Sequence, residues 1–284
     1  MTSIDRPMGL DGLCDSRGRF SILAIDHRDS LRAFLRPADP ESLDADEITA
    51  LKIELIDGVA DMASGVMLEP EYSIPQVLDA GVLPSGVGFL AALESQGYLD
   101  DPEASPTTIL DGWSIGQAQA SGAASAKLLL PYRPDRVEHA AAQEVVARHI
   151  TSGCHEVGFP IALEPLFYDL APTDDREAIV VETARRFAAI GPDLLKLPYP
   201  GSAAACAAVT EIAAMPWAML SGGGTFEAFA DQFAEAAGEG CAGFMVGRAL
   251  WGEWARASPE ERPALVGELV RPRFEELVAI TVNS

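Results

Sequence analysis

The chain has 284 residues, of which 48% are apolar, and its 43 acidic against 20 basic side chains give a formal net charge of -23. This length and apolar fraction exclude a disordered chain and can fill a sizeable core in one large domain or two ordinary ones. The acidic balance argues against a nucleic-acid partner and against docking on an anionic membrane, because both require a basic surface.

Short apolar runs bounded by glycine or polar residues alternate with helical patterns along the chain. Buried strands are predicted at 20–26, 65–69, 86–90, 126–130, 160–164, 194–197, 217–221 and 243–246. Helices are predicted at 44–62, 74–80, 112–120, 135–151, 174–190, 202–214, 225–237 and 259–280, with Gly153 as the C-cap of the fourth. Residues 99–108, rich in Pro, Asp and Ser, are predicted to form a long loop.

Eight strands joined by helical crossovers predict an α/β protein with a (β/α)8 TIM barrel, here a single domain over residues 1–284 with 1–19 as an N-terminal extension. The main alternative is an open doubly wound sheet. That fold would need a glycine-rich turn after the first strand, where this chain has Asp26-His27-Arg28. The barrel places chemistry at the carboxyl ends of its strands.

The start of the chain lacks a basic segment followed by an apolar one, so we expect no signal peptide, and no run reaches the roughly 18 apolar residues of a membrane span. The four cysteines, Cys14, Cys154, Cys206 and Cys241, have no C-x-x-C pair and no histidine at ligand spacing. We therefore predict reduced, mostly buried cysteines in a cytoplasmic protein without a cofactor or a metal.

Two of the three lysines of the chain, Lys127 and Lys196, fall inside predicted strands, whereas Lys52 falls on the first helix, where we expect an exposed salt bridge. Burial among leucines disfavours the charged form of Lys196, and a second cation such as Lys127 adds to this effect. A neutral amine can attack a ketone and form an imine, which allows the adjacent carbon–carbon bond to break. The alternative is a buried salt-bridge network of the two lysines with Glu164.

Glu164 ends an apolar strand and is the candidate general acid–base, because a low-dielectric site favours the protonated carboxyl. Its alternative role is to balance the charges of the two lysines. Asp26 ends the first strand and His27 is the only histidine at a strand end. A magnesium site formed by Asp26, Glu69 and Glu164 is a further alternative.

Two neighbouring strand ends carry an anion-binding pattern. Ser221, Gly222 and Gly223 follow the seventh strand and precede a helix, and Gly247-Arg248 follows the eighth strand. Backbone N–H groups at such a turn converge on an anion, and arginine can bind a phosphate through two hydrogen bonds. The loops after strands seven and eight are the usual phosphate position in this fold, although a glycine run can also be a simple tight turn.

Motifs at most of these strand ends carry a family resemblance, from about residue 20 to residue 255. They read AIDHRDSLRAFL, GVMLEPEYSIP, ESQGYLDD, AKLLLPYRPD, ALEPLFYD, DLLKLPYPG, LSGGGTFEAF and MVGRALW. In these motifs the sequence resembles the class I, Schiff-base aldolases of the tagatose 1,6-bisphosphate aldolase group, which includes the sulfofructosephosphate aldolases.

The resemblance implies cleavage of a ketose 1-phosphate to dihydroxyacetone phosphate and an aldehyde, without a metal and in a homo-oligomer. Lys196 matches the imine-forming lysine of the family, Lys127 its second lysine, Glu164 its acid–base and Asp26 its strand-one aspartate, which would orient a substrate hydroxyl. The positions that match its phosphate-binding ends are Ser221, Gly222, Gly247 and Arg248.

Three positions depart from the family pattern. His27 stands where glutamine is common, Pro198 where an acidic residue is frequent, and Pro131 where an aromatic residue is common. We expect Arg28 to contact the far end of the substrate, which these departures leave open as phosphate, sulfonate or hydroxyl. Two other functions stay open: a sugar-phosphate isomerase or metal-assisted lyase, and a non-catalytic barrel that binds a sugar phosphate.

Overall fold

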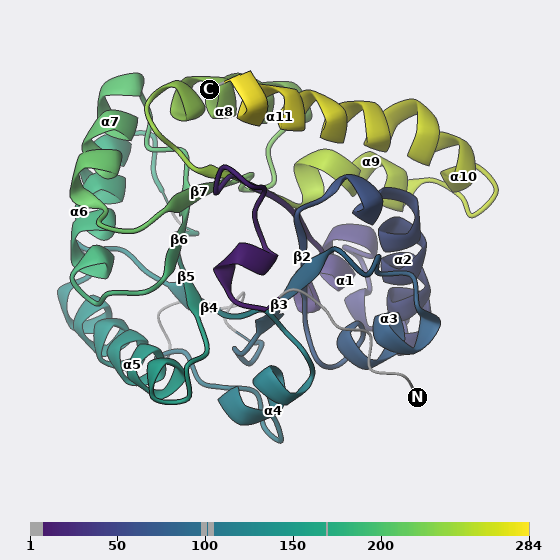
Figure 1. Cartoon of the computed structure of the whole chain (residues 1–284), viewed down its shortest axis with the longest axis horizontal. Coiled ribbons are helices and arrows are strands. Elements are labelled where there is room, and N and C mark those ends of the chain that lie inside the picture. Colours follow the sequence, from purple (N-terminus) through teal and green to yellow (C-terminus); the bar gives the residue numbers. More distant parts are fainter. Residues whose placement is uncertain (1–7, 98–100, 102–104, 169, 284) are drawn as a thin grey trace.

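A computed structural model describes residues 8–97, 101, 105–168 and 170–283. Its eight strands form a closed parallel barrel in the order β1 to β8 (Figure 1), which confirms the predicted (β/α)8 fold. The barrel closes between β1 and β8, where Phe20 pairs with Gly243. The strands are β1 Phe20–Ala24, β2 Gly65–Leu68, β3 Gly88–Ala92, β4 Ser125–Pro131, β5 Ile161–Leu166, β6 Leu194–Pro198, β7 Trp217–Leu220 and β8 Gly243–Val246.

Helices surround the ring of strands (Figure 1) and cover its outer face. Several begin at a side chain that caps the first turn: Asp44 forms a capping box with Glu47, and Ser202 and Thr225 accept backbone N–H groups of α7 and α8. The helices are α1 Asp29–Leu35, α2 Ala45–Val59, α3 Ile74–Ala80, α4 Ile115–Ala120, α5 Val137–Glu156, α6 Arg176–Ala188, α7 Ala203–Ile212, α8 Phe226–Gly238, α9 Arg248–Arg256, α10 Arg262–Leu265 and α11 Arg271–Asn283.

The amino-terminal end of the barrel is closed by the segment before β1. The short 3-10 helix η1, Leu10–Gly12, lies across this opening (Figure 1, purple). Leu13 is fully buried and packs against the side chains inside the barrel. The Ser64 hydroxyl donates a hydrogen bond to the Leu13 carbonyl at 2.7 Å. Apolar side chains such as Phe20 and Met245 complete this layer. The interior is therefore sealed at one end, and polar groups gather at the other.

Most predicted elements are present, with three informative differences. The third strand lies two residues later than predicted, because Gly88 and not Gly86 pairs with Gly65 of β2. Helix α5 continues through Gly153 to Glu156, so Gly153 as C-cap is wrong; the left-handed residue that follows the helix is Gly158, with φ 66°. The predicted helix 259–280 is divided into α10, a π-helical turn at Val266–Val270 and α11.

Two helices, α1 and α9, have no counterpart in the sequence prediction. Within the predicted loop 99–108, residues 101 and 105–108 are described and form no helix or strand, and the others lie outside the described residues, as do residues 1–7 of the predicted extension. All four cysteines are free; Cys14 is half-buried and the other three are buried, as predicted. None of the helices that the structure describes has the length and apolar character that a bilayer-spanning segment requires.

Candidate active site

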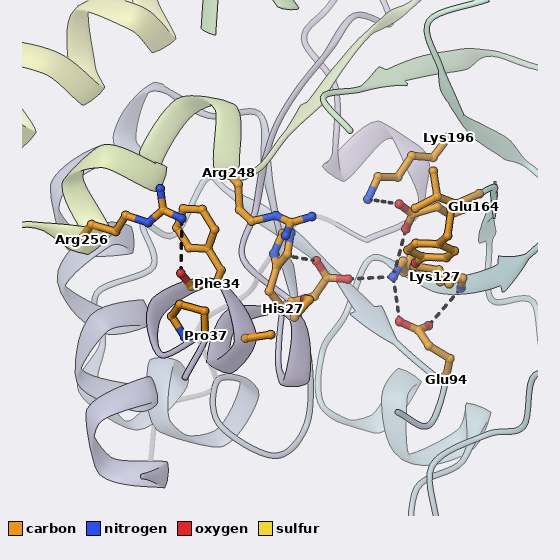
Figure 2. Close-up of a pocket in the computed structure, with 15 residues that line it drawn as sticks. His27, Phe34, Pro37, Glu94, Lys127, Glu164, Lys196, Arg248 and Arg256 are labelled. Atoms are coloured by element: carbon orange, nitrogen blue, oxygen red, sulfur yellow. Dashed lines mark hydrogen bonds and ion pairs between the residues drawn. The ribbon is translucent and has the colours of Figure 1, made fainter. Parts of the chain in front are cut away.

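The carboxyl ends of the strands bring distant polar residues to one cavity of about 550 Å³ (Figure 2). Asp26 follows β1, Glu94 follows β3, Lys127 lies on β4, Glu164 on β5 and Lys196 on β6. All five side chains are at most 9% exposed. Because parallel strands of a barrel end at the same face, residues up to 170 positions apart meet here.

Lys127 is the centre of this cluster. Its Nζ donates hydrogen bonds to Asp26 Oδ2 at 2.8 Å and to Glu94 Oε1 at 2.7 Å, and it lies 3.0 Å from Glu164 Oε2. An ammonium group has three N–H donors, and three carboxylates surround this one. Lys127 is therefore held as a cation that fixes the three acidic side chains relative to one another.

Glu164 bridges the two lysines. Its Oε1 lies 2.8 Å from Lys196 Nζ, and its Oε2 faces Lys127. That Oε2 is buried and accepts no hydrogen bond within the described part of the chain. Lys196 Nζ also lies 3.5 Å from the sulfur of Met67 and borders the cavity. The amine is thus paired with a buried carboxylate, and open space for a ligand lies beside it.

Asp26 and His27 show how the cations control protonation. Burial by itself raises the pKa of Asp26, but the charges of Lys127 and Lys196 outweigh it and hold this pKa well below its usual range. Burial lowers the pKa of His27 to about 3, since the attraction of Asp26 does not compensate for desolvation and the nearby Arg248. Asp26 is therefore an anion, and His27 a neutral imidazole, at neutral pH.

A second cavity, of about 270 Å³, adjoins the first at Lys196 and Arg248. Ser221, Gly222, Gly223 and Gly247, which the sequence predicted to form an anion site, line this cavity. Gly222 and Gly223 have φ of 58° and 79°, in the left-handed region that favours glycine. A Cβ on Gly223 would lie 3.3 Å from Nη2 of Arg248, so the loop leaves this guanidinium close to the backbone.

The loops after β7 and β8 are tied together. The backbone N–H of Gly247 donates to the Ser221 hydroxyl at 3.3 Å, and α9 begins at the next residue, Arg248. This is a short extra helix after the eighth strand, with its N-terminus at the cavity, a common phosphate-binding arrangement in barrels. Arg176, at the start of α6, also lines this cavity, and nothing in its sequence context marked it.

Arg28 does not line either cavity. It is 1% exposed, and it donates to Glu71 Oε2 at 2.7 Å and to the backbone carbonyl of Glu94 at 2.6 Å. Its contact with the far end of the substrate stays a prediction that this geometry does not support. Instead, Arg28 holds in place Glu94, whose only sequence signal is its position after the third strand.

The expectation that Lys52 forms an exposed salt bridge is wrong. Lys52 is fully buried and pairs with the equally buried Glu69. Glu69 also accepts the hydroxyl of Ser73 at 3.0 Å and the backbone N–H groups of Glu71 and Tyr72. A helix pattern shows which face is buried only when the packing partner is known. Glu69 is thereby turned away from the cavity, and the described residues contain no three carboxylate, histidine or cysteine side chains placed to hold a metal ion together.

The sequence is similar to those of known aldolases. The chain is 28% identical to the tagatose 1,6-diphosphate aldolase of Streptococcus agalactiae serotype V over 274 residues, which cover 85% of this chain and 83% of the relative. It is 27% identical to the tagatose 1,6-diphosphate aldolase of Streptococcus pneumoniae serotype 4, over 92% of this chain and 89% of the relative.

Among solved structures, a Schiff-base-forming fructose-1,6-bisphosphate aldolase shares the fold, with a TM-score of 0.67 and 20% identity over 93% of this chain and 96% of that one. The sequence model of the DeoC/LacD family aldolases matches residues 20–253, which contain all eight strands and the five polar residues of the cluster. Membership of an aldolase family argues against two of the alternative functions considered for the sequence, a sugar-phosphate isomerase and a non-catalytic barrel that binds a sugar phosphate. The chain belongs to the DeoC/LacD family of aldolases and is a carbon–carbon lyase.

Proposed function

We propose that this aldolase cleaves a ketose 1-phosphate to dihydroxyacetone phosphate and an aldehyde through an imine on Lys196. The observation that carries the proposal is the pair of Lys196 Nζ and Glu164 Oε1, 2.8 Å apart at the edge of a cavity. The names of the relatives, tagatose 1,6-diphosphate aldolases and a Schiff-base-forming aldolase, support the same chemistry.

The first half of the reaction forms the imine. Glu164 accepts a proton from the Lys196 ammonium, and the neutral amine attacks the C2 carbonyl to give a carbinolamine. Glu164 then returns the proton to the departing hydroxyl, and water leaves as the protonated imine forms. Lys127 stays charged throughout because Asp26 and Glu94 hold its N–H groups.

The second half breaks the bond between C3 and C4. A base removes the proton of the C4 hydroxyl, the aldehyde leaves, and the electron pair moves to the imine nitrogen to give an enamine. Glu164 is the proposed base, because it lines the cavity and its buried Oε2 accepts no hydrogen bond among the described residues beyond its ion pair with Lys127. Asp26 lines the cavity and is kept ionised by the two lysines, which supports its proposed role of orienting a substrate hydroxyl. Protonation of the enamine at C3 and addition of water then release dihydroxyacetone phosphate.

The phosphate of the shared product fits the second cavity. Backbone N–H groups of Ser221, Gly222 and Gly223, the N-terminus of α9 at Gly247, and Arg248 supply donors and positive charge there. The substrate classes that fit this assignment are ketose 1,6-bisphosphates of the tagatose type and 6-deoxy-6-sulfofructose 1-phosphate. Assembly as a homo-oligomer and a cytoplasmic location stay predictions.

Borohydride reduction in the presence of dihydroxyacetone phosphate tests the proposal. Reduction converts the imine to a stable secondary amine, so mass spectrometry should find one adduct per chain. The chain has three lysines, so peptide mapping assigns the modified one directly. An adduct at Lys196 supports the proposal. Modification of Lys127 or Lys52 instead, or no adduct under turnover conditions, contradicts it.

A further inference from the structure

Two lysines lie on either side of Glu164, and their surroundings differ. Oε1 of Glu164 lies 2.8 Å from Lys196 Nζ and Oε2 lies 3.0 Å from Lys127 Nζ, so one carboxylate separates the two nitrogens. Both lysines line the larger cavity, and an uncharged amine on either of them can attack a carbonyl group. An imine that forms on only one lysine therefore requires that the other keeps its proton.

The two amines differ in the number of carboxylates that they face. Lys127 Nζ is close to three carboxylates, those of Asp26 at 2.8 Å, Glu94 at 2.7 Å and Glu164 at 3.0 Å. Among the described residues, the only carboxylate within ion-pair distance of Lys196 Nζ is that of Glu164. Each nearby carboxylate favours the charged form of an amine, so the proton is held more firmly on Lys127.

Glu94 is held by the protein through its side chain and its backbone. Its Oε1 accepts a hydrogen bond from Lys127, and its Oε2 accepts the backbone N–H of Leu129 at 3.1 Å. Its backbone carbonyl accepts Nη2 of Arg28 at 2.6 Å, and Arg28 also donates to Glu71 at 2.7 Å. Glu94 is 2% exposed. Because both of its carboxylate oxygens are occupied by protein donors, Glu94 acts through Lys127 and not on the substrate.

We propose that Glu94 is a positioning residue that selects which lysine forms the imine, because it keeps Lys127 charged and so leaves Lys196 as the nucleophile. This inference rests on the proposed function, in which Glu164 exchanges a proton with Lys196. Figure 2 shows Glu94 and Glu164 on opposite sides of the Lys127 amine. Without Glu94 this ammonium group loses one charge-assisted hydrogen bond, and Glu164 can then take a proton from either lysine.

The test asks whether Lys127 becomes reactive when Glu94 is made neutral. In the Lys196→Met protein, treatment with dihydroxyacetone and borohydride should leave little adduct on Lys127. Adding Glu94→Gln should increase that adduct about 10- to 100-fold, the equilibrium equivalent of one hydrogen bond to a charged group. Peptide mapping by mass spectrometry measures the adduct.

The chemistry of this trapping reaction defines what is detected. The Lys127 nitrogen bonds to C2 of dihydroxyacetone, the carbonyl oxygen leaves as water with the two amine hydrogens, and borohydride supplies the hydride that reduces the imine. Dihydroxyacetone is the probe because it carries no phosphate. It is therefore not held at the glycine loop and can approach either nitrogen.

Glu71→Gln in the same Lys196→Met background is the matched control. It is the same substitution at the other glutamate that binds Arg28, but Glu71 lines neither cavity of the site, so the adduct on Lys127 should not increase. If Glu94→Gln does not fold, Glu94→Asp in the same background withdraws the charge by one methylene and should give a smaller increase. An equal effect of the Glu71 and Glu94 substitutions, or no effect of either, overturns the proposal.

The chain with Lys196 in place provides a second measurement. There Glu94→Gln should lower kcat about 10- to 100-fold, because Glu164 then exchanges protons with two amines, and should leave KM within about threefold, because the phosphate site is unchanged. Borohydride trapping should now modify Lys127 as well as Lys196. A change in KM alone, with the adduct confined to Lys196, contradicts the proposal.

Failure of this inference can be separated from failure of the proposed function. If the unaltered chain is trapped on Lys196 and no Glu94 variant makes Lys127 reactive, only the role of Glu94 is wrong. If the unaltered chain gives no adduct on Lys196, the imine mechanism itself is wrong, and the selection between the two lysines is overturned with it.

Discussion

Apart from the contacts of Lys127, two buried lysine–glutamate pairs of the barrel look alike in composition and differ in surroundings. Lys52 and Glu69 are fully buried, and Lys196 and Glu164 are 6% and 5% exposed at their side chains. Glu69 accepts hydrogen bonds from Ser73 and from the backbone of Glu71 and Tyr72 in addition to Lys52. Glu164, in contrast, has a buried Oε2 that accepts no hydrogen bond among the described residues beyond its ion pair with Lys127, and its pair with Lys196 borders a cavity.

The difference shows that a perturbed lysine is not by itself a reactive one. Burial lowers the pKa of Lys52 even though Glu69 opposes the shift, yet Lys52 lines neither of the two cavities of the site. A nucleophile also requires space for the substrate and a partner that can take up and return a proton. Only the pair of Lys196 and Glu164 combines these, so the first pair serves the fold and we assign the second to chemistry.

The largest expected effect on activity comes from the pair that borders the cavity, Lys196 and Glu164. Lys196→Met removes the proposed nucleophile, so we expect kcat/KM to fall by about 10⁴-fold or more, as when a covalent catalyst is deleted. The fold should persist, because Glu164 keeps Lys127 as a partner. Activity assays and thermal unfolding of the same preparation measure both. Residual activity near that of the unaltered chain, or loss of the folded state, would contradict the assignment of Lys196 to chemistry and not to the fold.

The pair that lines neither cavity of the site, Lys52 and Glu69, should affect stability and not activity. Lys52→Met leaves Glu69 buried with an uncompensated charge, so we expect about 3–5 kcal/mol less stability toward urea unfolding. Activity per folded molecule should change only a few-fold, because Lys52 lies outside both cavities. The double variant Lys52→Met with Glu69→Gln should recover part of the stability, since the amide oxygen still accepts backbone N–H groups. Without such recovery, the buried charge is not the cause.

The smallest expected effect is on stability and concerns His27, which lines both cavities together with Lys196 and Glu164. Its pKa is about 3 in the folded chain and near 6.5 when unfolded, so between these values only the unfolded state gains a proton. Stability should therefore decrease as pH falls below about 6.5, by on the order of 1–2 kcal/mol at pH 5.

His27→Gln should abolish that part of the pH dependence. Urea unfolding between pH 5 and pH 7 measures it, above the range in which Asp26 contributes, since the stability from its lowered pKa is lost only below about pH 4. Identical pH dependence in both proteins would show that His27 is not buried as a neutral imidazole.

The sequence predicted which residues meet at the cavity wherever one strand decided the position of a residue. Asp26, Lys127, Glu164 and Lys196 were found because a buried strand of a barrel delivers its last polar residue to a common face. The same rule located Gly247 and Arg248, although no signal predicted that a helix begins there.

Residues whose role depends on two or more segments were missed or misjudged. Arg28 was expected to contact the substrate, but it is hydrogen-bonded to Glu71 and to the carbonyl of Glu94 and lines neither cavity of the site. Lys52 was expected at the surface, because the helical pattern did not reveal that its side chain reaches Glu69.

The sequence by itself determined the barrel, because alternating buried strands and helices are local patterns and a closed ring buries all eight strands. It also determined which residues stand at the strand ends. Only the tertiary structure decided which of two lysine–glutamate pairs faces a cavity. Exposure, hydrogen-bond saturation and open space are properties of several segments together, and no single segment of the chain encodes them.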